Sequence, residues 1–364
     1  MRRIRILRYY KDVETQSQTD TQLFVDVIRG KAGRDQLGAL LNQAFNVPAE
    51  QQFFDDFPIW DEDHNSGSSQ IVRIGVYNGA TLVSSTGVRM AKLKAPNGPL
   101  PIALIGAVAT HPDWRGHGFA SRTVQLASQW ARDQGAAMIL LWGSEYELYR
   151  KQGFELCGSQ LLLPIANIPN PPAHELVHTG WNPALYRSLQ SRRHGLMLSD
   201  SDRSWYESHR GVQWYWVGDA SKPDAYAAIG RGIDLPNIVH EWGGIGSALR
   251  ATLSAVRDQH PLASVLAAPQ LLTALGLHES SATPEPLCMA HIIDPVQVYR
   301  YFDQSGEAGE ILAESQNNGR TTTWNLKVRG RTYDLNDFEL APLFFGTQEG
   351  QFAFPLWIWG LDAC

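Results

Sequence analysis

The sequence predicts a mixed α/β protein with two related α/β domains and a smaller α+β segment at the C-terminal end. Over residues 22–165 the pattern is strand, helix, three strands, helix, strand, helix, strand, an order typical of a mixed α/β domain. A fainter version of this order follows over residues 175–293, and residues 294–364 form a third, shorter segment. The length of 364 residues fits this organisation, because it equals about two and a half average domains.

Local patterns predict each element of the first domain. LFVDVI at 23–28 alternates as a strand does, and the apolar spacing over Arg34–Phe45 is typical of a helix. Asn78-Gly79, between two strand-like runs, is a strong signal for a hairpin turn. The remaining predictions are strands at Ile71–Tyr77, Ala80–Ala91, Pro101–Thr110, 138–142 and 154–163, and helices at Phe119–Gln134 and 147–152.

Composition and charge exclude several classes of protein. The net charge of -6 gives no indication of a nucleic-acid partner, which would call for a basic domain. Three widely spaced cysteines exclude a disulfide framework or a zinc ribbon. Residues 1–21 form a polar leader without the apolar stretch of a signal peptide, and no 18-residue apolar run predicts a membrane span. We therefore expect a soluble, cytoplasmic protein.

The second half of the chain carries signs of an internal duplication. A proline-rich stretch supplies a linker at 166–174, before the second domain. Trp242–Ala248 then matches Trp114–Ala120 at a constant offset of 128 residues, and the order of elements around the two segments agrees. Further along, alternating residues over 321–335 predict a hairpin that turns at Arg329-Gly330.

The most informative stretch is residues 105–135, where a strand, a proline and a glycine-rich turn precede an amphipathic helix. The first N–H groups of a helix lack internal partners, and glycines let a phosphate approach the backbone closely. Arg115 would add a charge-assisted contact. The stretch therefore predicts a phosphate-binding loop. It lacks the Gly-Lys-Ser/Thr of a Walker loop. Compared with a dinucleotide-binding fingerprint, Ser121 stands at the third position of G-x-G-x-x-G, and the next strand ends without the downstream acid.

Two linked motifs resemble the GCN5-related N-acetyltransferase (GNAT) superfamily: Arg115-x-x-Gly118-x-Ala120 after a strand, and Tyr149-x-x-x-Gly153-Phe154 downstream. With a weaker second domain and a short third segment, the chain resembles the tandem-domain acetyltransferases related to the enhanced-intracellular-survival (Eis) proteins. In those proteins two acetyltransferase-type domains precede a sterol-carrier-like domain.

This resemblance implies a role for each matching residue. The strand end would pair its backbone with the pantetheine arm of acetyl-CoA, the loop would hold the pyrophosphate, and two residues after the buried strand would line the thiol end. Tyr149 would protonate the leaving thiolate, and the chain's terminal carboxylate, on Cys364, would take the proton of the amine. The cofactor-binding residues so implied are Val108, Ala109, Thr110, Arg115, Gly116, His117, Gly118, Phe119, Ala120, Ser121, Ser144 and Glu145.

The predicted function is transfer of an acetyl group from acetyl-CoA to a primary amine, by direct attack on the thioester. Tyr149 serves as the general acid because a neutral phenol can donate a proton at physiological pH. The acceptor would be an amine-bearing small molecule or a lysine side chain, no metal is required, and the resemblance allows a homo-oligomer. One alternative keeps the fold without the activity, as a catalytically silent CoA-binding or interaction protein.

A second alternative is a zinc hydrolase, since His174-Glu175-Leu176-Val177-His178 spells H-E-x-x-H. That chemistry needs both histidines on one face of a stable helix, and prolines on both sides leave little room for one.

The second domain is predicted to be degenerate as an enzyme. Gly243 replaces the loop arginine, and Leu272 stands where Tyr149 would be. In the first domain, the acid-rich stretch Asp55–Asp63 is either a solvated loop or a surface that attracts a cationic amine.

Overall fold

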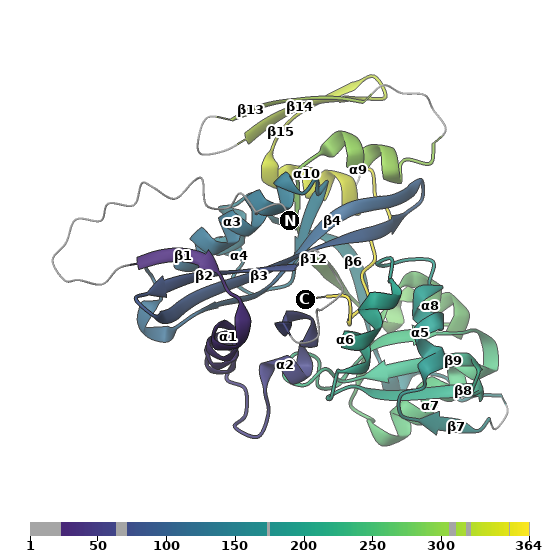
Figure 1. Cartoon of the computed structure of the whole chain (residues 1–364). Helices are drawn as coiled ribbons and strands as arrows, with labels where there is room; N and C mark the ends of the chain where they lie inside the picture. Colours follow the sequence, from purple (N-terminus) through teal and green to yellow (C-terminus); the bar gives the residue numbers. More distant parts are fainter. Residues whose placement is uncertain are drawn as a thin grey trace.

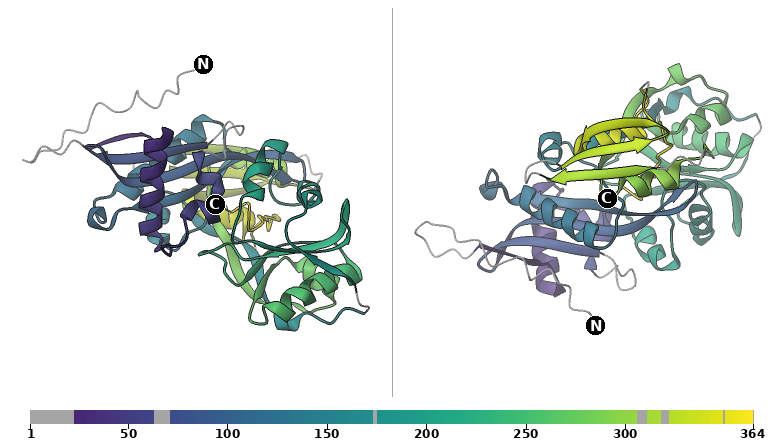
Figure 2. Two further views of the ribbon diagram at one scale, coloured as in Figure 1. Left: turned by 60° about the horizontal axis from the view of Figure 1, so that its bottom comes forward. Right: turned by 90° about the horizontal axis from the view of Figure 1, so that it is seen from above.

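The structure, a computed structural model, describes residues 23–62, 71–172, 175–305, 311–317, 322–348 and 350–363. Within them, twelve strands form one sheet in the order β1-β2-β3-β4-β5-β12-β6-β11-β10-β9-β8-β7, and three more form a separate sheet, β13-β14-β15. Figures 1 and 2 show the first half of the chain on one side of the large sheet's centre and the second half on the other. The predicted mixed α/β fold class is confirmed.

The first half follows the predicted order of elements. Its strands are β1 (Leu23–Val27), β2 (Ile71–Asn78), β3 (Thr81–Ala95), β4 (Gly98–Thr110), β5 (Met138–Leu141) and β6 (Glu155–Pro164). Its helices are α1 (Gly30–Ala44), α2 (Phe53–Asp56), α3 (Phe119–Asp133) and α4 (Tyr146–Arg150). The hairpin at Asn78-Gly79 is confirmed, because Asn78 pairs with Thr81. Helix α1 begins four residues before the predicted start, at Gly-Lys-Ala-Gly, a stretch without apolar periodicity.

Two layers of helices cover the first half of the sheet (Figure 1). Helix α3 packs Val124, Ala127 and Ala131 against strands β2 to β5 on one face. Helix α1 packs Leu37 and Leu41 on the other face, together with Trp60 and the end of β4. Both faces of β4 are therefore buried along most of its length, as expected for a central strand.

The second half supplies the rest of the large sheet. Its strands are β7 (Val177–Thr179), β8 (Gln213–Asp219), β9 (Lys222–Ile229), β10 (Ile238–Gly243), β11 (Ser264–Ala267) and β12 (Thr283–Ile292). Its helices are α5 (Pro183–Gln190), α6 (Arg203–Glu207), α7 (Gly246–Gln259) and α8 (Pro269–Leu275). Sequence analysis did not predict β12, which lies antiparallel between β5 and β6 and joins the two halves of the sheet.

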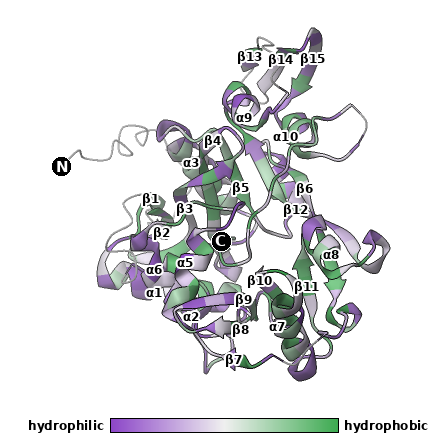
Figure 3. Cartoon of the chain, turned by 90° about the vertical axis from the view of Figure 1, so that its right-hand side faces the viewer, coloured by the Kyte–Doolittle hydropathy of each residue, from purple (hydrophilic) through white to green (hydrophobic). Residues whose placement is uncertain are grey.

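The C-terminal segment covers the centre of the molecule. It comprises α9 (Pro295–Phe302), β13 (Leu312–Asn317), β14 (Thr322–Val328), β15 (Arg331–Asn336) and α10 (Asp337–Phe345). Val328 pairs with Arg331, which confirms the hairpin turn at Arg329-Gly330. Figure 3 shows this segment and the second half lying on opposite sides of the central strands. No helix in the described ranges has both the length and the apolar character needed to cross a membrane.

Candidate active site

Strands β4 and β5 run side by side for only four residues and then part. Their parallel pairing joins Ile102–Ile105 of β4 to Met138–Leu141 of β5. Among the described residues no strand pairs with the last five residues of β4 on this side. The predicted contact segment, Val108 to Thr110, lies in this part of β4. Its exposed backbone edge can accept an extended chain as an added strand would.

A bulge changes the direction of the side chains just before this segment. On the β3 side, the pairing register shifts between Gly106 and Ala109, and Ala107 has a positive φ of 50°. An extra residue in a strand reverses which side chains face each side of the sheet. As a result Ala107 and Ala109 face the α1 layer, whereas Val108 packs in the α3 layer.

The glycine-rich loop leads directly into α3. Gly116 and Gly118 have φ values of 80° and 79°, and a β-carbon added to either would meet no atom within 4 Å. Both glycines therefore adopt the left-handed conformation beside open space, with the free N–H groups of α3 following at Phe119. Such a turn has the geometry that a bound phosphate needs.

Two polar residues of the loop make only local contacts. The Arg115 side chain is exposed, and its Nε donates to the Thr110 carbonyl at 3.4 Å. The His117 ring stacks on Phe119 at 5.8 Å, and its Nδ1 lies 3.0 Å from the Arg115 carbonyl. His117 thus stabilises the turn, whereas Arg115 is accessible to a ligand.

Tyr149, on α4, is buried beside the end of β5. Its side chain is 5% exposed, and its ring packs edge-on against Phe154. A β-carbon on Gly143 would stand 3.2 Å from the Tyr149 hydroxyl oxygen. Burial, with a smaller effect of Glu145, raises the pKa of Tyr149 to about 12. The phenol is therefore protonated at physiological pH, and it is a weaker acid than a solvated tyrosine.

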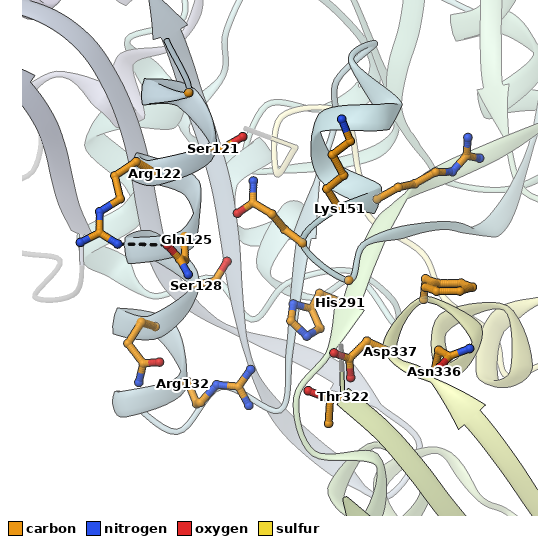
Figure 4. Close-up of a pocket in the computed structure, with 16 residues that line it drawn as sticks. Ser121, Arg122, Gln125, Ser128, Arg132, Lys151, His291, Thr322, Asn336 and Asp337 are labelled. Carbon is orange, nitrogen blue, oxygen red and sulfur yellow. Dashed lines mark hydrogen bonds between the residues drawn. The ribbon is translucent and has the colours of Figure 1, made fainter. Parts of the chain in front are cut away.

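A pocket of about 640 Å³ opens between α3 and the α4–β6 turn (Figure 4). Gly118 and Ser121 of the predicted set line it. The other predicted residues, including Tyr149, Ser144 and Glu145, do not, and the latter two are exposed beyond the end of β5. Sequence analysis missed most of the lining, which includes four basic side chains: Arg122, Arg132, Arg150 and Lys151.

The pocket also contains buried polar atoms that have no partner. Ser128 Oγ, Gln152 Oε1 and His291 Nδ1 form no hydrogen bond within the part of the chain that the structure describes. Burial lowers the pKa of His291 to about 4, so its ring is neutral. Unsatisfied donors and acceptors next to four cations fit a polar, anionic ligand such as the phosphate-bearing part of CoA.

The C-terminal segment forms the far wall of this pocket. Thr322, Asn336 and Asp337 face α3 across the opening (Figure 4), and Phe338 also lines the pocket. The Asp337 carboxylate accepts a 2.6 Å hydrogen bond from Trp324 Nε1, which fixes the start of α10. This wall comes from residues about 200 positions beyond the loop, and no local motif in the sequence indicates it.

The last described residues lie between the two halves of the sheet. Leu361 packs in the cluster that contains Ala107 and Ala109 of β4. Arg231 Nη1 donates to the Ala363 carbonyl at 2.6 Å, and the buried Asp362 carboxylate accepts from the Tyr206 hydroxyl. The predicted base, the terminal carboxylate of Cys364, lies outside the described residues.

The acid-rich stretch is largely engaged in internal contacts. Asp61 forms two hydrogen bonds with Arg34, at 2.5 and 2.7 Å, and Asp55 lies 3.3 Å from Arg210. Asp56 is buried and accepts from the Ile233 backbone, and burial raises its pKa. Asp63 lies outside the described residues. Residues 56–61 are buried, and the described carboxylates anchor the stretch inside the protein, so it is neither a solvated loop nor an exposed surface that attracts an amine.

The geometry of the H-E-x-x-H segment contradicts a zincin site. Val177–Thr179 is strand β7, and the His178 ring stacks on Trp216 at 4.2 Å. Two histidine ligands one helical turn apart require a helix there. His174 lies outside the described residues, while Glu175 is described and half-buried.

The first half of the chain contains an acetyltransferase-type domain. Residues 30–157 match the family model described as the acetyltransferase (GNAT) domain, and this part of the chain is a domain of that family. No curated protein is significantly similar to the chain.

Several solved structures share the fold over nearly the whole chain. Eis1 from Mycobacterium abscessus is 12% identical, with a TM-score of 0.61 and coverage of 90% of each chain. A GCN5-related N-acetyltransferase from Anabaena variabilis is 17% identical, with a TM-score of 0.60 and coverage of 89% of this chain and 90% of that one. Another from Kribbella flavida is 16% identical, with a TM-score of 0.59 and coverage of 86% and 83%. The predicted resemblance to Eis-type acetyltransferases is thus confirmed at the level of fold.

Proposed function

We propose that the protein transfers an acetyl group from acetyl-CoA to a primary amine, on a small molecule or a lysine side chain. The main support is the joint placement of three features: the free edge of β4, the left-handed glycine loop that opens α3, and the adjoining basic pocket. The free edge of β4 fits an extended pantetheine arm, and the glycine loop fits a pyrophosphate. The basic pocket fits the remaining phosphate and the adenosine.

In this reaction the amine nitrogen forms a bond to the acetyl carbon, and the bond from that carbon to the CoA sulfur breaks. Tyr149 supplies the proton that the sulfur takes up. Its raised pKa keeps the proton on the phenol until the thiolate leaves, and the buried position of the ring excludes water from the transfer. Backbone N–H groups near the β4 bulge would stabilise the oxyanion.

The amine must also lose a proton, and we assign this step to the terminal carboxylate of Cys364. Support comes from the contacts of the preceding residues, which bring the tail to the α1 side of β4, opposite the basic pocket. An α-carboxyl has a pKa of about 3.5, so it would act through water or after desolvation. Appending Gly-Ser to the chain moves this carboxylate without removing any residue. We expect kcat to fall about 10-fold or more while the affinity for acetyl-CoA is retained; an unchanged kcat would exclude the role.

We also propose that residues 175–293 are a degenerate second acetyltransferase-type domain and that residues 294–364 are a small third domain. The order of β10, α7, β11 and α8 supports this division, since it repeats that of β4, α3, β5 and α4. The second domain and the tail would then shape the acceptor side of the single working site.

Release of free thiol from acetyl-CoA, measured against a panel of polyamines, aminoglycosides, amino acids and lysine peptides, tests the proposed function. We expect turnover that depends on the amine. Tight binding of acetyl-CoA without turnover on any amine would instead favour the catalytically silent CoA-binding protein.

A further inference from the structure

A second pocket, of about 840 Å³, lies in the other half of the molecule, where β10 and β11 part. These two strands pair in parallel only at Ile238–Val239, as β4 and β5 do over a short stretch. Gly243 and Gly244 line the pocket on one side, and Ala268 and Pro269 line it on the other. The pocket therefore occupies the position in the second half that corresponds to the proposed cofactor cleft of the first.

The lining of this pocket differs in kind from that of the basic pocket. Trp242, Trp357 and Trp359 form an aromatic wall in which neighbouring rings meet edge-to-face at 5.1 and 5.5 Å. The last two belong to the chain's own C-terminal tail, which is held along β10 by a hydrogen bond from Gly360 N to the His240 carbonyl. Most of the exposed lining is apolar, as is usual for pockets that bind small organic molecules.

Two buried N–H donors in this lining have no partner. Trp242 and Trp359 each donate their indole N–H to a backbone carbonyl, at 2.8 and 3.0 Å. Trp357 Nε1, in contrast, has no hydrogen-bond partner among the described residues.

Arg192 supplies the second donor. Its side chain is 5% exposed, its Nε donates to Tyr226, and one terminal nitrogen binds Glu241. Its Nη1 has no partner in the described part of the chain. The guanidinium also lies 4.6 Å over the Trp359 ring, which places its charge at the aromatic wall. A buried donor without an acceptor destabilises a folded protein, so both groups favour a ligand that brings acceptor oxygens.

We propose that this pocket binds a small aromatic carboxylate, with its ring against the tryptophan wall and its carboxylate accepting from Arg192 and Trp357. Aromatic rings pack favourably on tryptophan, and a carboxylate accepts two N–H donors at once. Arg193 also lines the pocket and adds a second positive charge, and Asp224 is the acidic side chain among the described lining residues. CoA, with its several phosphate charges, does not match this lining, because Arg192 and Arg193 are the arginine and lysine side chains among the described lining residues and Glu241 already neutralises the charge of Arg192, which leaves only its Nη1 donor for one carboxylate.

Isothermal titration of the full chain with 2-naphthoate tests this proposal, with 2-naphthylmethanol, decanoate and CoA as comparison ligands. We expect 2-naphthoate to bind, 2-naphthylmethanol to bind about 10-fold more weakly, and decanoate to bind more weakly than 2-naphthoate. No binding of 2-naphthoate at millimolar concentration would overturn the proposal, as would tighter binding of decanoate or CoA in this pocket.

Variants locate the binding. Trp357→Phe keeps an aromatic ring at this position and removes the N–H donor, so the Kd for 2-naphthoate should rise about 3- to 10-fold. Trp181→Phe, a matched change outside the pocket, should leave this Kd unchanged.

Ser159→Trp and Gln270→Trp each place a large ring in the pocket from an exposed position, on β6 and α8. Either one, if folded by its melting temperature, should abolish binding of 2-naphthoate while leaving CoA binding intact. Undiminished 2-naphthoate binding in both would refute the site.

Discussion

The hydroxyl of Tyr149 lies against Gly143, so closely that a β-carbon on this glycine would stand 3.2 Å from the phenolic oxygen and 2.9 Å from Cε2 of the ring. Gly143 follows β5, the strand that parts from β4. The end of β5 therefore fixes the position of the proposed general acid.

Gly143→Ala should displace the Tyr149 ring and lower kcat about 10-fold, because a shift of even an ångström misplaces a proton donor. Steady-state kinetics of the single and double variants measure this. In a Tyr149→Phe background the same alanine should have little further effect, since the hydroxyl is already gone. Equal losses in both backgrounds would show that Gly143 acts independently of Tyr149.

The basic pocket should recognise the phosphate-bearing end of the donor. Arg132→Met and Lys151→Met should each raise the KM for acetyl-CoA about 3- to 10-fold at low salt, and less at high salt. The KM for S-acetylpantetheine, which has no phosphate, should not change. Lys31→Met, at an exposed position on α1, is the matched control. A similar loss with both donors would contradict a phosphate contact.

The raised pKa of Tyr149 predicts the alkaline side of the pH–rate profile. Since burial raises this pKa to about 12, the phenol keeps its proton well above pH 10. We expect kcat to rise as the amine acceptor deprotonates and then to remain level to about pH 10.5. A decline centred near pH 10, present in the wild type and absent from Tyr149→Phe, would mean that Tyr149 titrates as a solvated phenol.

His291 should make the protein sensitive to acid. Its pKa is lowered from 6.5 to about 4 in the folded state, chiefly by burial, so the unfolded chain binds a proton more readily. This contribution to stability is complete above pH 6.5 and is lost as the pH falls toward 4. At pH 5 the loss is about 2 kcal/mol. Urea unfolding at pH 7.5 and pH 5 measures it.

His291→Gln should show a smaller drop in unfolding free energy between these two pH values than the wild type does. An identical drop would mean that other groups cause the acid sensitivity.

Much of the first half was predictable because its signals are local. Asn78-Gly79 specifies its own turn, and the glycines before Phe119 specify the start of α3. Part of the pocket lining could also be predicted from residue spacing alone, because Gln125 and Arg132 lie on the same polar face of α3 as Ser121.

The rest depends on contacts between distant segments. Strand β12 pairs with β5 across about 150 residues of sequence, and Asp337 reaches the pocket from the third segment. Neither the sequence of β12 nor the sequence around Asp337 contains a turn, cap or periodic pattern that predicts which distant segment it contacts. The burial that raises the pKa of Tyr149 likewise depends on the assembled fold, so a motif alone suggested an ordinary phenol.

The most direct test of the central claim is thiol release from acetyl-CoA by wild type and Tyr149→Phe, with the best amine of the panel and with the Kd for acetyl-CoA measured alongside. We expect kcat to fall about 100-fold or more while the Kd stays within about 2-fold, because the hydroxyl acts on the leaving sulfur and not on the bound nucleotide. An unaltered kcat would contradict the role of Tyr149 as general acid.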